Sequence, residues 1–464
     1  MKNWKRFMAL GIAVVMAVST TACGGGKKEE SKEEETEVSD IAFEKETEIN
    51  IGVYQDMYYD SSHTAIEDNP NLNDKDTAQM QLDNVRAVEK RYNCKFYFKN
   101  LTWEGIIESI NTSIMSGTPD CQLYDVQFSY GIPAIMAGSC QALEDFIPAD
   151  DDVFTEQKYM KSLKVMDQEK SYLFASSGGV DTTAMGLCFN MDIVCKERGL
   201  ENPQDIYDRG EEWTWDLFQE YLEKCTFDRD GDGSIDVYGY GGAWTNTLWQ
   251  LLMSNATGMA FSDKQLLTTK EDIEVFTFID NMYNKWKIAK PWDESDFMGN
   301  GRTWADGLVA FWPAQHWMLN ESDIYSKDWE LGVVPWPVGP SGNKETNYTN
   351  QVAGDWMIIP VGIDNPYTIY SMYADYQRWY GDNIELISDT SWAEDCFVTE
   401  RNFNYIVEMS KPEKAVFDVG ATFQTDFSLQ PMLLGKETAA QVAEKYSNDI
   451  QNELDLYLGK SGQK

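Results

Sequence analysis

The chain has 464 residues, of which 42% are hydrophobic, 38 are basic and 77 are acidic, so its formal net charge is −39. A chain of this length is too long for one hydrophobic core and predicts two or three domains. The acidic balance argues against nucleic acid or an anionic membrane surface as the principal partner. The two histidines, His63 and His316, leave few options for histidine-based metal sites or general bases.

Residues 1–22 have the pattern of an export signal. A basic start precedes an apolar run at residues 7–18, which is too short for a comfortable transmembrane helix. The segment that follows, Ser19-Thr20-Thr21-Ala22-Cys23-Gly24, resembles the lipobox of bacterial lipoproteins. The resemblance implies cleavage before Cys23 and a lipid on its sulfur. The alternative is an ordinary signal peptide cut after Ala22.

Residues 23–47 are rich in Glu and Lys and have almost no large apolar side chain. They cannot bury enough surface to order themselves, so we expect a flexible acidic tether, with the folded part starting at Glu48. The remaining cysteines are irregularly spaced and form no C-x-x-C pair, so we expect them to be mostly reduced, buried apolar residues. They are Cys94, Cys121, Cys140, Cys188, Cys195, Cys225 and Cys396.

The start of the folded part predicts an α/β arrangement. Strands are expected at residues 49–53, 95–98 and 124–128, and helices at residues 80–92 and 106–114. This alternation implies a parallel sheet with helices packed on its faces. Ligands of such sheets lie at the carboxyl ends of strands. The candidates at these ends are therefore Asp56, Tyr58, Ser129 and Tyr130.

Further strands are expected at residues 172–175 and 185–190, and a helix from Met191 to Gly199. Thr214 is suited to cap a helix that begins at Trp215. The spacing of apolar residues predicts later helices at 271–286, 368–380 and 437–458.

The stretch from Trp304 to Trp317 contains three tryptophans and His316. Its apolar run, Gly307 to Trp312, is typical of a buried strand that ends at a proline. Indole rings offer flat apolar faces for the C–H face of a sugar, although each tryptophan can equally be a core residue. We hypothesise that this segment crosses between two lobes and that Trp317 faces the cleft between them.

An Asp-rich loop at residues 228–239 has the spacing of a calcium loop. Carboxylates stand at positions 1, 3, 5 and 9, and a glycine stands at position 6. Position 12, where a bidentate Glu is expected, is Gly239. A structural Ca²⁺ is the functional interpretation, and a solvated turn is the alternative. The candidate ligands are Asp228, Asp230, Asp232, Ser234 and Asp236.

Taken together, the motifs resemble extracellular solute-binding protein family 1, the maltose-binding-protein-like lipoproteins of ABC sugar importers. The resemblance extends over residues 48–458, and its pieces follow one another in the family's order. It is carried by residues 186–192 with Gly199-Leu200 and Pro203, by 213–216, 228–239, 307–317 and 331–340, and by the terminal helix after 435–438.

The resemblance implies a periplasmic-binding-protein-like type II fold, with two α/β lobes, a ligand cleft and three crossings between the lobes. By matching, the crossings fall near residues 175–180, 311–314 and 356–362. Residues 48–175 and 314–357 would then form the first lobe, and residues 176–313 and 358–464 the second.

The resemblance also implies a sugar site lined by aromatic side chains. Trp317 matches the family's cleft tryptophan, and Trp244 falls where members place a stacking aromatic residue. Asp56 lies where members commonly place an acceptor for sugar hydroxyls. Asp355 and Trp356 lie at the third crossing.

The implied function is that of a monomeric substrate-binding lipoprotein, not an enzyme. It would capture a sugar or oligosaccharide and deliver it to the permease subunits of an ABC importer. Cys23 would anchor it at the extracytoplasmic face of the cell membrane. The alternatives are a binding lipoprotein for a peptide or another solute, an adhesin, and a surface glycosidase with paired carboxyl groups.

Overall fold

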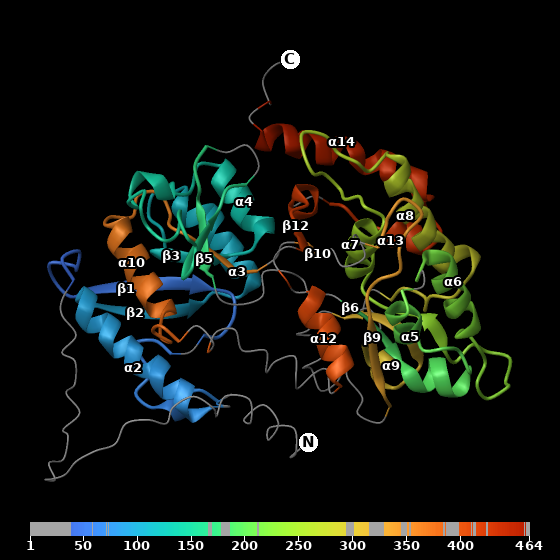
Figure 1. Ribbon diagram of the computed structural model, residues 1–464. Coiled ribbons are helices and arrows are strands. Elements are labelled where there is room, and N and C mark those ends of the chain that lie inside the picture. The colour runs from blue at the N-terminus through green and yellow to red at the C-terminus, as the bar shows by residue number, and fades with distance from the viewer. Residues whose placement is uncertain are drawn as a thin grey trace, which may run out of the picture. The chain divides into compact units, whose positions relative to one another are not determined.

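The computed structural model describes most of residues 39–460 (Figure 1). The described residues do not include 1–38, 58, 71, 73, 166–168, 178–185, 211–212, 294–300, 315–328, 345–349, 352–353, 384–385, 387–398, 410, 412–413, 424–425, 459 and 461–464.

The first lobe is built on a six-stranded sheet with the strand order β2-β1-β3-β11-β5-β4. β1 is parallel to β2 and β3, as the sequence predicted, whereas β11 is antiparallel to β3 and β5, and β4 is antiparallel to β5. The strands are β1 (Thr47–Val53), β2 (Cys94–Asn100), β3 (Leu123–Val126), β4 (Met160–Leu163), β5 (Leu173–Ser176) and β11 (Trp356–Ile358).

Two groups of helices bury the first sheet. The neighbours α2 (Lys75–Tyr92) and α10 (Pro366–Gln377) share one hydrophobic cluster with β1 (Figure 1). A second cluster joins β3 to α3 (Trp103–Ser109), to its π-helical continuation η2 (Ile110–Ile114), and to α4 (Phe128–Met136). The predicted helices at residues 80–92 and 106–114 are thus confirmed.

The second lobe is built on a four-stranded sheet with the order β7-β8-β6-β9. β6 is antiparallel to both β8 and β9, and β7 is parallel to β8. The strands are β6 (Gly186–Asn190), β7 (Tyr238–Tyr240), β8 (Val309–Ala314) and β9 (Leu331–Val334). Two further short strands, β10 (Asn350–Gln351) and β12 (Ala415–Val416), pair with each other.

Helices cover this sheet with apolar faces. The predicted helices correspond to η4 (Asp192–Glu197), α6 (Trp215–Lys224), α8 (Lys270–Asp280) with η5 (Asn281–Lys285), and α14 (Ala439–Tyr457). Thr214 caps α6 by accepting a hydrogen bond from the Leu217 amide, as predicted. The other helices are α5 (Pro203–Asp208), α7 (Trp244–Ser254), α9 (Gly301–Ala305), α12 (Glu400–Met409) and α13 (Gln430–Leu433).

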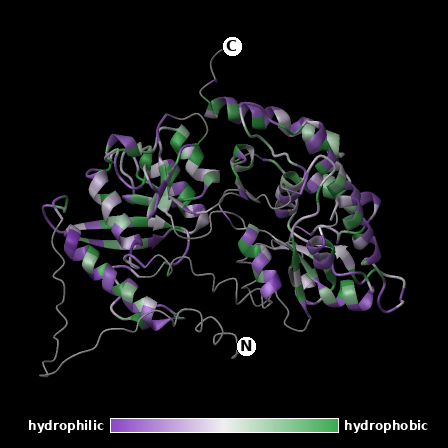
Figure 2. Cartoon of the chain, viewed as in Figure 1, coloured by the Kyte–Doolittle hydropathy of each residue, from purple (hydrophilic) through white to green (hydrophobic). Residues whose placement is uncertain are grey.

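The hydropathy of the chain follows this architecture. Hydrophobic and hydrophilic residues alternate along the helices and along the strands of the first sheet (Figure 2). In α14, for example, Val442, Ile450 and Leu454 are fully buried, whereas Glu444, Lys445, Asn448 and Asp449 are exposed. This spacing is the reason why the helix could be predicted from the sequence.

The predicted boundaries of the lobes are wrong in two places. Residues 314–357 were assigned to the first lobe, but β9 within them pairs with β6 of the second sheet. Residues 358–464 were assigned to the second lobe, but α10 packs against the first sheet. The chain passes between the lobes after β5, between β9 and β11, and between α10 and α12.

The stretch around Trp312 forms a buried strand, as predicted, but it does not cross between the lobes. Phe311–Ala314 belongs to β8 and pairs with β6 along its length. Trp304 and Trp312 are fully buried and stacked, with ring centroids 5.5 Å apart, so both are core residues.

The tether prediction also needs correction at its carboxyl end. Residues 39–47 are bound to the first lobe: the amides of Ser39 and Phe43 donate to the carbonyls of Arg91 and Tyr92. Ile41 and Phe43 pack against the α2–α10 cluster. The folded part therefore starts at about residue 39 and not at Glu48, because these two apolar side chains supply an anchor.

Of the six described cysteines, all except the half-buried Cys195 are buried, as expected. Cys23 and Cys396 lie outside the described residues. Within the described part of the chain, no helix is long and apolar enough to cross a membrane.

Candidate functional site

Three polar side chains meet at one edge of the first sheet. Tyr54 follows the end of β1, Gln127 follows the end of β3, and Asp355 immediately precedes the antiparallel β11. The Tyr54 hydroxyl donates to Asp355 Oδ1 at 2.9 Å. Gln127 Nε2 donates to the same oxygen at 3.3 Å and to the Tyr54 hydroxyl oxygen at 3.1 Å. We call Tyr54, Gln127 and Asp355 the strand-edge cluster.

Burial and the carboxyl groups near the cluster keep the Tyr54 hydroxyl in its neutral, protonated form. Burial, followed by the charges of Asp355 and Asp125, raises the pKa of Tyr54. Tyr54 therefore remains a hydrogen-bond donor at physiological pH. Asp355 itself is exposed, so its second carboxylate oxygen can accept a hydrogen bond from a hydroxyl group of a solute.

Aromatic side chains flank the cluster. Trp103, the first residue of α3, is 38% exposed, and its ring lies nearly perpendicular to the rings of Tyr54 and Tyr130, at centroid distances of 5.5 and 5.2 Å. Trp356 is buried and stacks on Phe128 at 5.9 Å. An exposed indole beside a carboxylate and a phenol is the combination that binds a sugar ring through its C–H face and its hydroxyl rim.

The structure brings several predicted residues to this edge. Asp56 is exposed, and its Oδ1 accepts a hydrogen bond from Asn100 Nδ2 at the end of β2. Ser129 and Tyr130 lie in the first turn of α4 and not in a loop after β3, because the predicted strand 124–128 already ends at Val126. Ser129 is half-buried and Tyr130 is buried.

The other predicted contacts lie elsewhere or outside the described residues. Trp244 opens α7 in the second lobe, where it is half-buried against the core and 6.0 Å from the ring of Phe427. Tyr58 and Trp317 lie outside the described residues, so their predicted roles stay predictions.

Four residues of this region were missed by the sequence analysis: Tyr54, Trp103, Asp125 and Gln127. Tyr54 directly follows the predicted strand 49–53, so a stricter use of the strand-end rule would have found it. Gln127 was missed because the predicted strand 124–128 extended past the actual end of β3 at Val126. No sequence signal pointed to Trp103, because its exposure depends on its packing against Tyr54 and Tyr130.

The Asp-rich loop of the second lobe gathers three of its five predicted ligands. Carboxylate oxygens of Asp228, Asp230 and Asp236 lie within 4.8 Å of one another, whereas Asp232 is not part of this group of carboxylates. The predicted role of Ser234 stays a prediction. A side chain at Gly239 is sterically excluded, because a Cβ there would lie 2.2 Å from the Leu222 carbonyl oxygen. A twelfth-position carboxylate cannot arise here, so a bound Ca²⁺ would be held by these three aspartates, backbone carbonyls and water.

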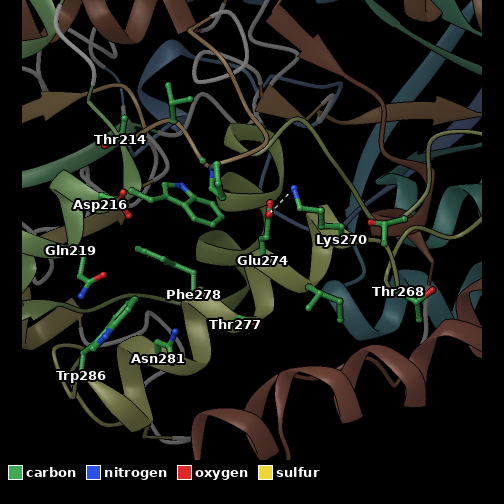
Figure 3. Close-up of a pocket in the computed structure, with 16 residues that line it drawn as sticks. Thr214, Asp216, Gln219, Thr268, Lys270, Glu274, Thr277, Phe278, Asn281 and Trp286 are labelled. Carbon is green, nitrogen blue, oxygen red and sulfur yellow. Dashed lines mark ion pairs between the residues drawn. The ribbon is translucent and has the colours of Figure 1, made fainter.

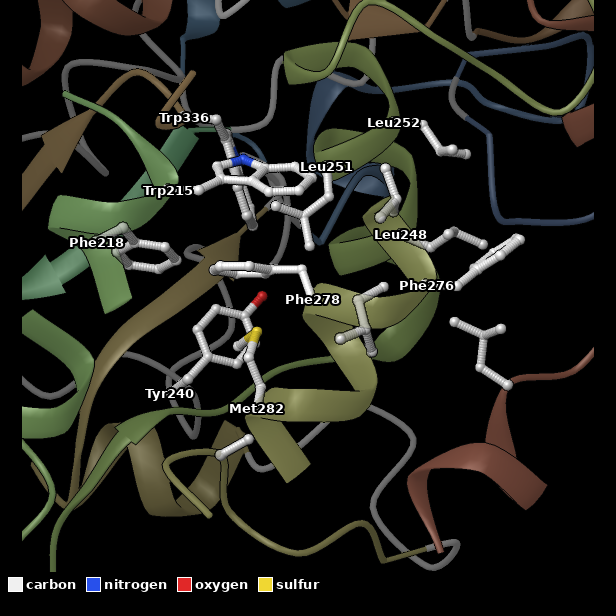
Figure 4. Close-up of a cluster of buried hydrophobic side chains, with 14 of the residues drawn as sticks. Trp215, Phe218, Tyr240, Leu248, Leu251, Leu252, Phe276, Phe278, Met282 and Trp336 are labelled. Carbon is white, nitrogen blue, oxygen red and sulfur yellow. The ribbon is translucent and has the colours of Figure 1, made fainter. Parts of the chain in front are cut away.

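A cavity of about 720 Å³ lies elsewhere, between α6 and α8 of the second lobe (Figure 3). The ion pair Lys270–Glu274, 3.2 Å apart, lies along it. Trp215 and Phe278 line it, but both rings are almost fully buried and belong to the hydrophobic core (Figure 4). The cavity contains none of the predicted site residues, and its aromatic surface is already used for packing.

A smaller cavity of about 270 Å³ lies in the first lobe beside α2 and α10. Its charged side chains already have partners within the protein: Arg91 pairs with Asp375 at 3.0 Å, and Asp151 accepts a hydrogen bond from Tyr370. By contrast, Asp355 of the strand-edge cluster and the neighbouring residues Asp56 and Trp103 are exposed to solvent. It is therefore the stronger candidate for solute binding.

No family model and no curated protein matches this sequence. Solved structures do match the fold. An ABC substrate-binding protein from Listeria monocytogenes in complex with cycloalternan aligns with a TM-score of 0.60 at 14% identity, over 89% of this chain and 99% of that one. A maltose/maltodextrin-binding domain, MalE, from Bdellovibrio bacteriovorus bound to maltotriose aligns with a TM-score of 0.57 at 14% identity, over 88% and 99%.

A third match is a cyclic α-maltosyl-1,6-maltose binding protein from Arthrobacter globiformis, with a TM-score of 0.55 at 15% identity, over 90% of this chain and 100% of that one. These alignments span nearly the whole of each relative. The chain therefore has the periplasmic-binding-protein-like type II fold, in the form found in ABC sugar-binding proteins.

Proposed function

We propose that this chain is the substrate-binding lipoprotein of an ABC importer and that it captures a sugar or oligosaccharide between its lobes. The observation that carries the proposal is the strand-edge cluster, in which Asp355 offers an exposed acceptor and binds Tyr54, whose ring contacts the exposed indole of Trp103. The fold supports it, because the matching structures were solved as binding proteins, several with sugars or sugar alcohols bound.

Capture follows from hydrogen bonding and stacking rather than from covalent chemistry. The solute's hydroxyl groups would donate to Asp355 and Asp56, while a C–H face of one ring would cover Trp103. Trp244, which opens α7 of the second lobe, is the proposed aromatic partner from that lobe, and Trp317 remains a further candidate on the ground of the family resemblance. Closure of the lobes would then be driven by contacts that only the closed form makes.

The amino-terminal segment around Cys23 supports delivery to a permease, because a lipid anchor would hold the folded part at the membrane. Cys23 follows a lipobox-like segment, and an acidic stretch separates it from the first lobe, which begins at about residue 39. A lipid on Cys23 would hold the folded part at the extracytoplasmic face of the membrane as a monomer. Mass spectrometry of the mature chain tests this: a diacylglyceryl group on Cys23 supports it, and a chain beginning at Cys23 without lipid contradicts it.

A thermal-shift screen tests the binding function. The chain lacking residues 1–22 is heated with tagatose, mannitol, ribitol, maltotriose or cycloalternan, and in parallel with tripeptides. Binding to the folded state alone stabilises the protein by about 2.7 kcal/mol at a hundredfold excess over the dissociation constant. A shift with one sugar supports the proposal, whereas a shift with peptides alone favours the competing non-sugar receptor.

A surface glycosidase is the less favoured alternative. The reason to test it is a pair of neighbouring carboxyl groups in the first lobe, Asp125 and Asp355. Incubation with a chromogenic glycoside separates the two functions. Release of the chromophore would identify an enzyme, and binding without release would identify a receptor.

A further inference from the structure

Asp125 and Asp355 are cross-strand neighbours. Met357 of β11 pairs with Asp125 of β3, and Trp356 pairs with Val126 in the same antiparallel register. Asp355 immediately precedes β11 and is two residues from Met357, so a continuation of this register puts it diagonally opposite Asp125 on the same face of the sheet. Diagonal neighbours are about 7–8 Å apart, and the charge of Asp355 acts on Asp125. A buried carboxyl group therefore lies near the exposed carboxylate of the strand-edge cluster.

The surroundings of Asp125 do not favour a second negative charge. Asp125 is 5% exposed, and its Oδ1 has no hydrogen-bond partner among the described residues. Burial and the charge of Asp355 raise the pKa of Asp125 well above its usual range. An unpaired, desolvated carboxylate next to a like charge is costly, and protonation removes that cost.

The groups that face Asp125 from the neighbouring elements are acids of higher pKa. They are Tyr54 after β1, Tyr130 on α4 and Tyr373 on α10, whose pKa values are raised first by burial and also by the nearby carboxyl groups. All three phenols are neutral at physiological pH. None of the described groups that interact with Asp125 supplies a positive charge to balance an ionised carboxylate.

We propose that Asp125 is not a contact of the solute site: its buried carboxyl group stays protonated, so that of the two carboxyl groups Asp355 alone accepts the solute's hydroxyl groups. This inference rests on the proposed function. It distinguishes the two carboxyl groups, because Asp355 contacts the solute whereas Asp125 does not. The neutral isostere Asn should therefore replace Asp125, but not Asp355, without loss of binding.

The protonation of Asp125 can be measured without any solute. Infrared difference spectra of the full-length chain in detergent at neutral pH compare the wild type with Asp125→Asn. We expect the band of one protonated carboxylic acid to disappear in the variant. The variant Asp272→Asn, which removes another buried carboxyl group with a raised pKa, calibrates the size of such a loss. Loss of a carboxylate band instead would overturn the proposal.

Unfolding as a function of pH gives a second, independent measurement. A buried acid whose pKa is raised in the folded state stabilises that state at low pH, and this contribution declines as the pH rises through the folded pKa. The stability of Asp125→Asn relative to the wild type should therefore grow with pH. A difference that is constant across pH would indicate a merely structural role and would contradict the proposal.

Binding variants complete the test. With whichever of the five screened sugars raises the melting temperature, Asp125→Asn should keep its dissociation constant within about threefold, whereas Asp355→Asn should weaken it more than tenfold. An equal loss in both variants would make Asp125 a charged contact of the solute and overturn the inference. If no sugar binds at all, the proposed function fails, while the infrared and unfolding measurements still decide the protonation state of Asp125.

Discussion

Replacement of Trp103 by Ala offers the sharpest test of the stacking surface. A tryptophan side chain presents roughly 250 Å², and Trp103 is 38% exposed, so roughly 95 Å² is open to a solute. If a sugar ring covers about half of this area, burial at about 25 cal/mol per Å² stabilises the complex by about 1.2 kcal/mol. The dissociation constant of Trp103→Ala should therefore rise about eightfold.

The assay is isothermal titration calorimetry with the sugar selected by the thermal-shift screen. Trp103→Phe serves as the matched control, because it keeps a flat ring against Tyr54 and Tyr130 and should lose only two- to threefold. An unchanged dissociation constant in Trp103→Ala, with the melting temperature preserved, would show that the solute does not cover this ring. The stacking part of the site assignment would then be refuted.

Three further predictions concern stability. Burial raises the pKa of Asp272 to about 8, so the stabilisation that its protonated form gives the folded state declines as the pH rises from about 4 towards 8. Compared with the wild type, Asp272→Asn should therefore be more stable by on the order of a few kcal/mol at pH 8 and by little at pH 4, as measured by calorimetric melts. A gain in stability that does not depend on pH would contradict this prediction. The buried Tyr457 hydroxyl donates to the Val165 carbonyl at 2.8 Å, so Tyr457→Phe should lower the free energy of unfolding in urea by about 1 kcal/mol, and no change would show that this bond contributes nothing. If the Asp-rich loop holds Ca²⁺, a chelator should lower the melting temperature of the wild type but not of Asp228→Asn, whereas equal melting curves with and without chelator would leave the loop a solvated turn.

Much of the fold was predictable because its elements carry strong local patterns. The apolar residues of α14 recur about every four positions, and the alternation in β1 repeats every two, so both elements were identified. The same holds for α6, where Thr214 marks the start. In each case the residue pattern within a single segment is enough to identify the helix or strand.

The assignment of segments to lobes depended on pairing, which local patterns do not encode. The apolar run of β9 is equally suited to either sheet, and only its hydrogen bonds with β6 place it in the second lobe. Likewise, α10 belongs to the first lobe because its apolar face meets α2 and β1, more than 250 residues earlier in the chain. Such long-range choices could not be read from spacing.

The candidate site was predicted in part. Asp56, Tyr130, Asp355 and Trp356 were chosen from strand ends and family resemblance, and the structure places all four at one edge of the first lobe. Trp103 was missed because its exposure arises from tertiary packing. The contrast between Trp312, which is core, and Trp103, which is exposed, shows that residue type alone does not distinguish the two uses of tryptophan.

The central claim is that this chain binds a sugar at the strand-edge cluster without altering it. The most direct measurement is a calorimetric titration of the chain lacking residues 1–22 with the sugar selected by the screen, followed by mass analysis of the recovered sugar. We predict one sugar bound per chain, a sugar recovered intact, and no binding heat in Asp355→Ala. Binding that persists in Asp355→Ala, or a sugar recovered in cleaved form, would contradict the account.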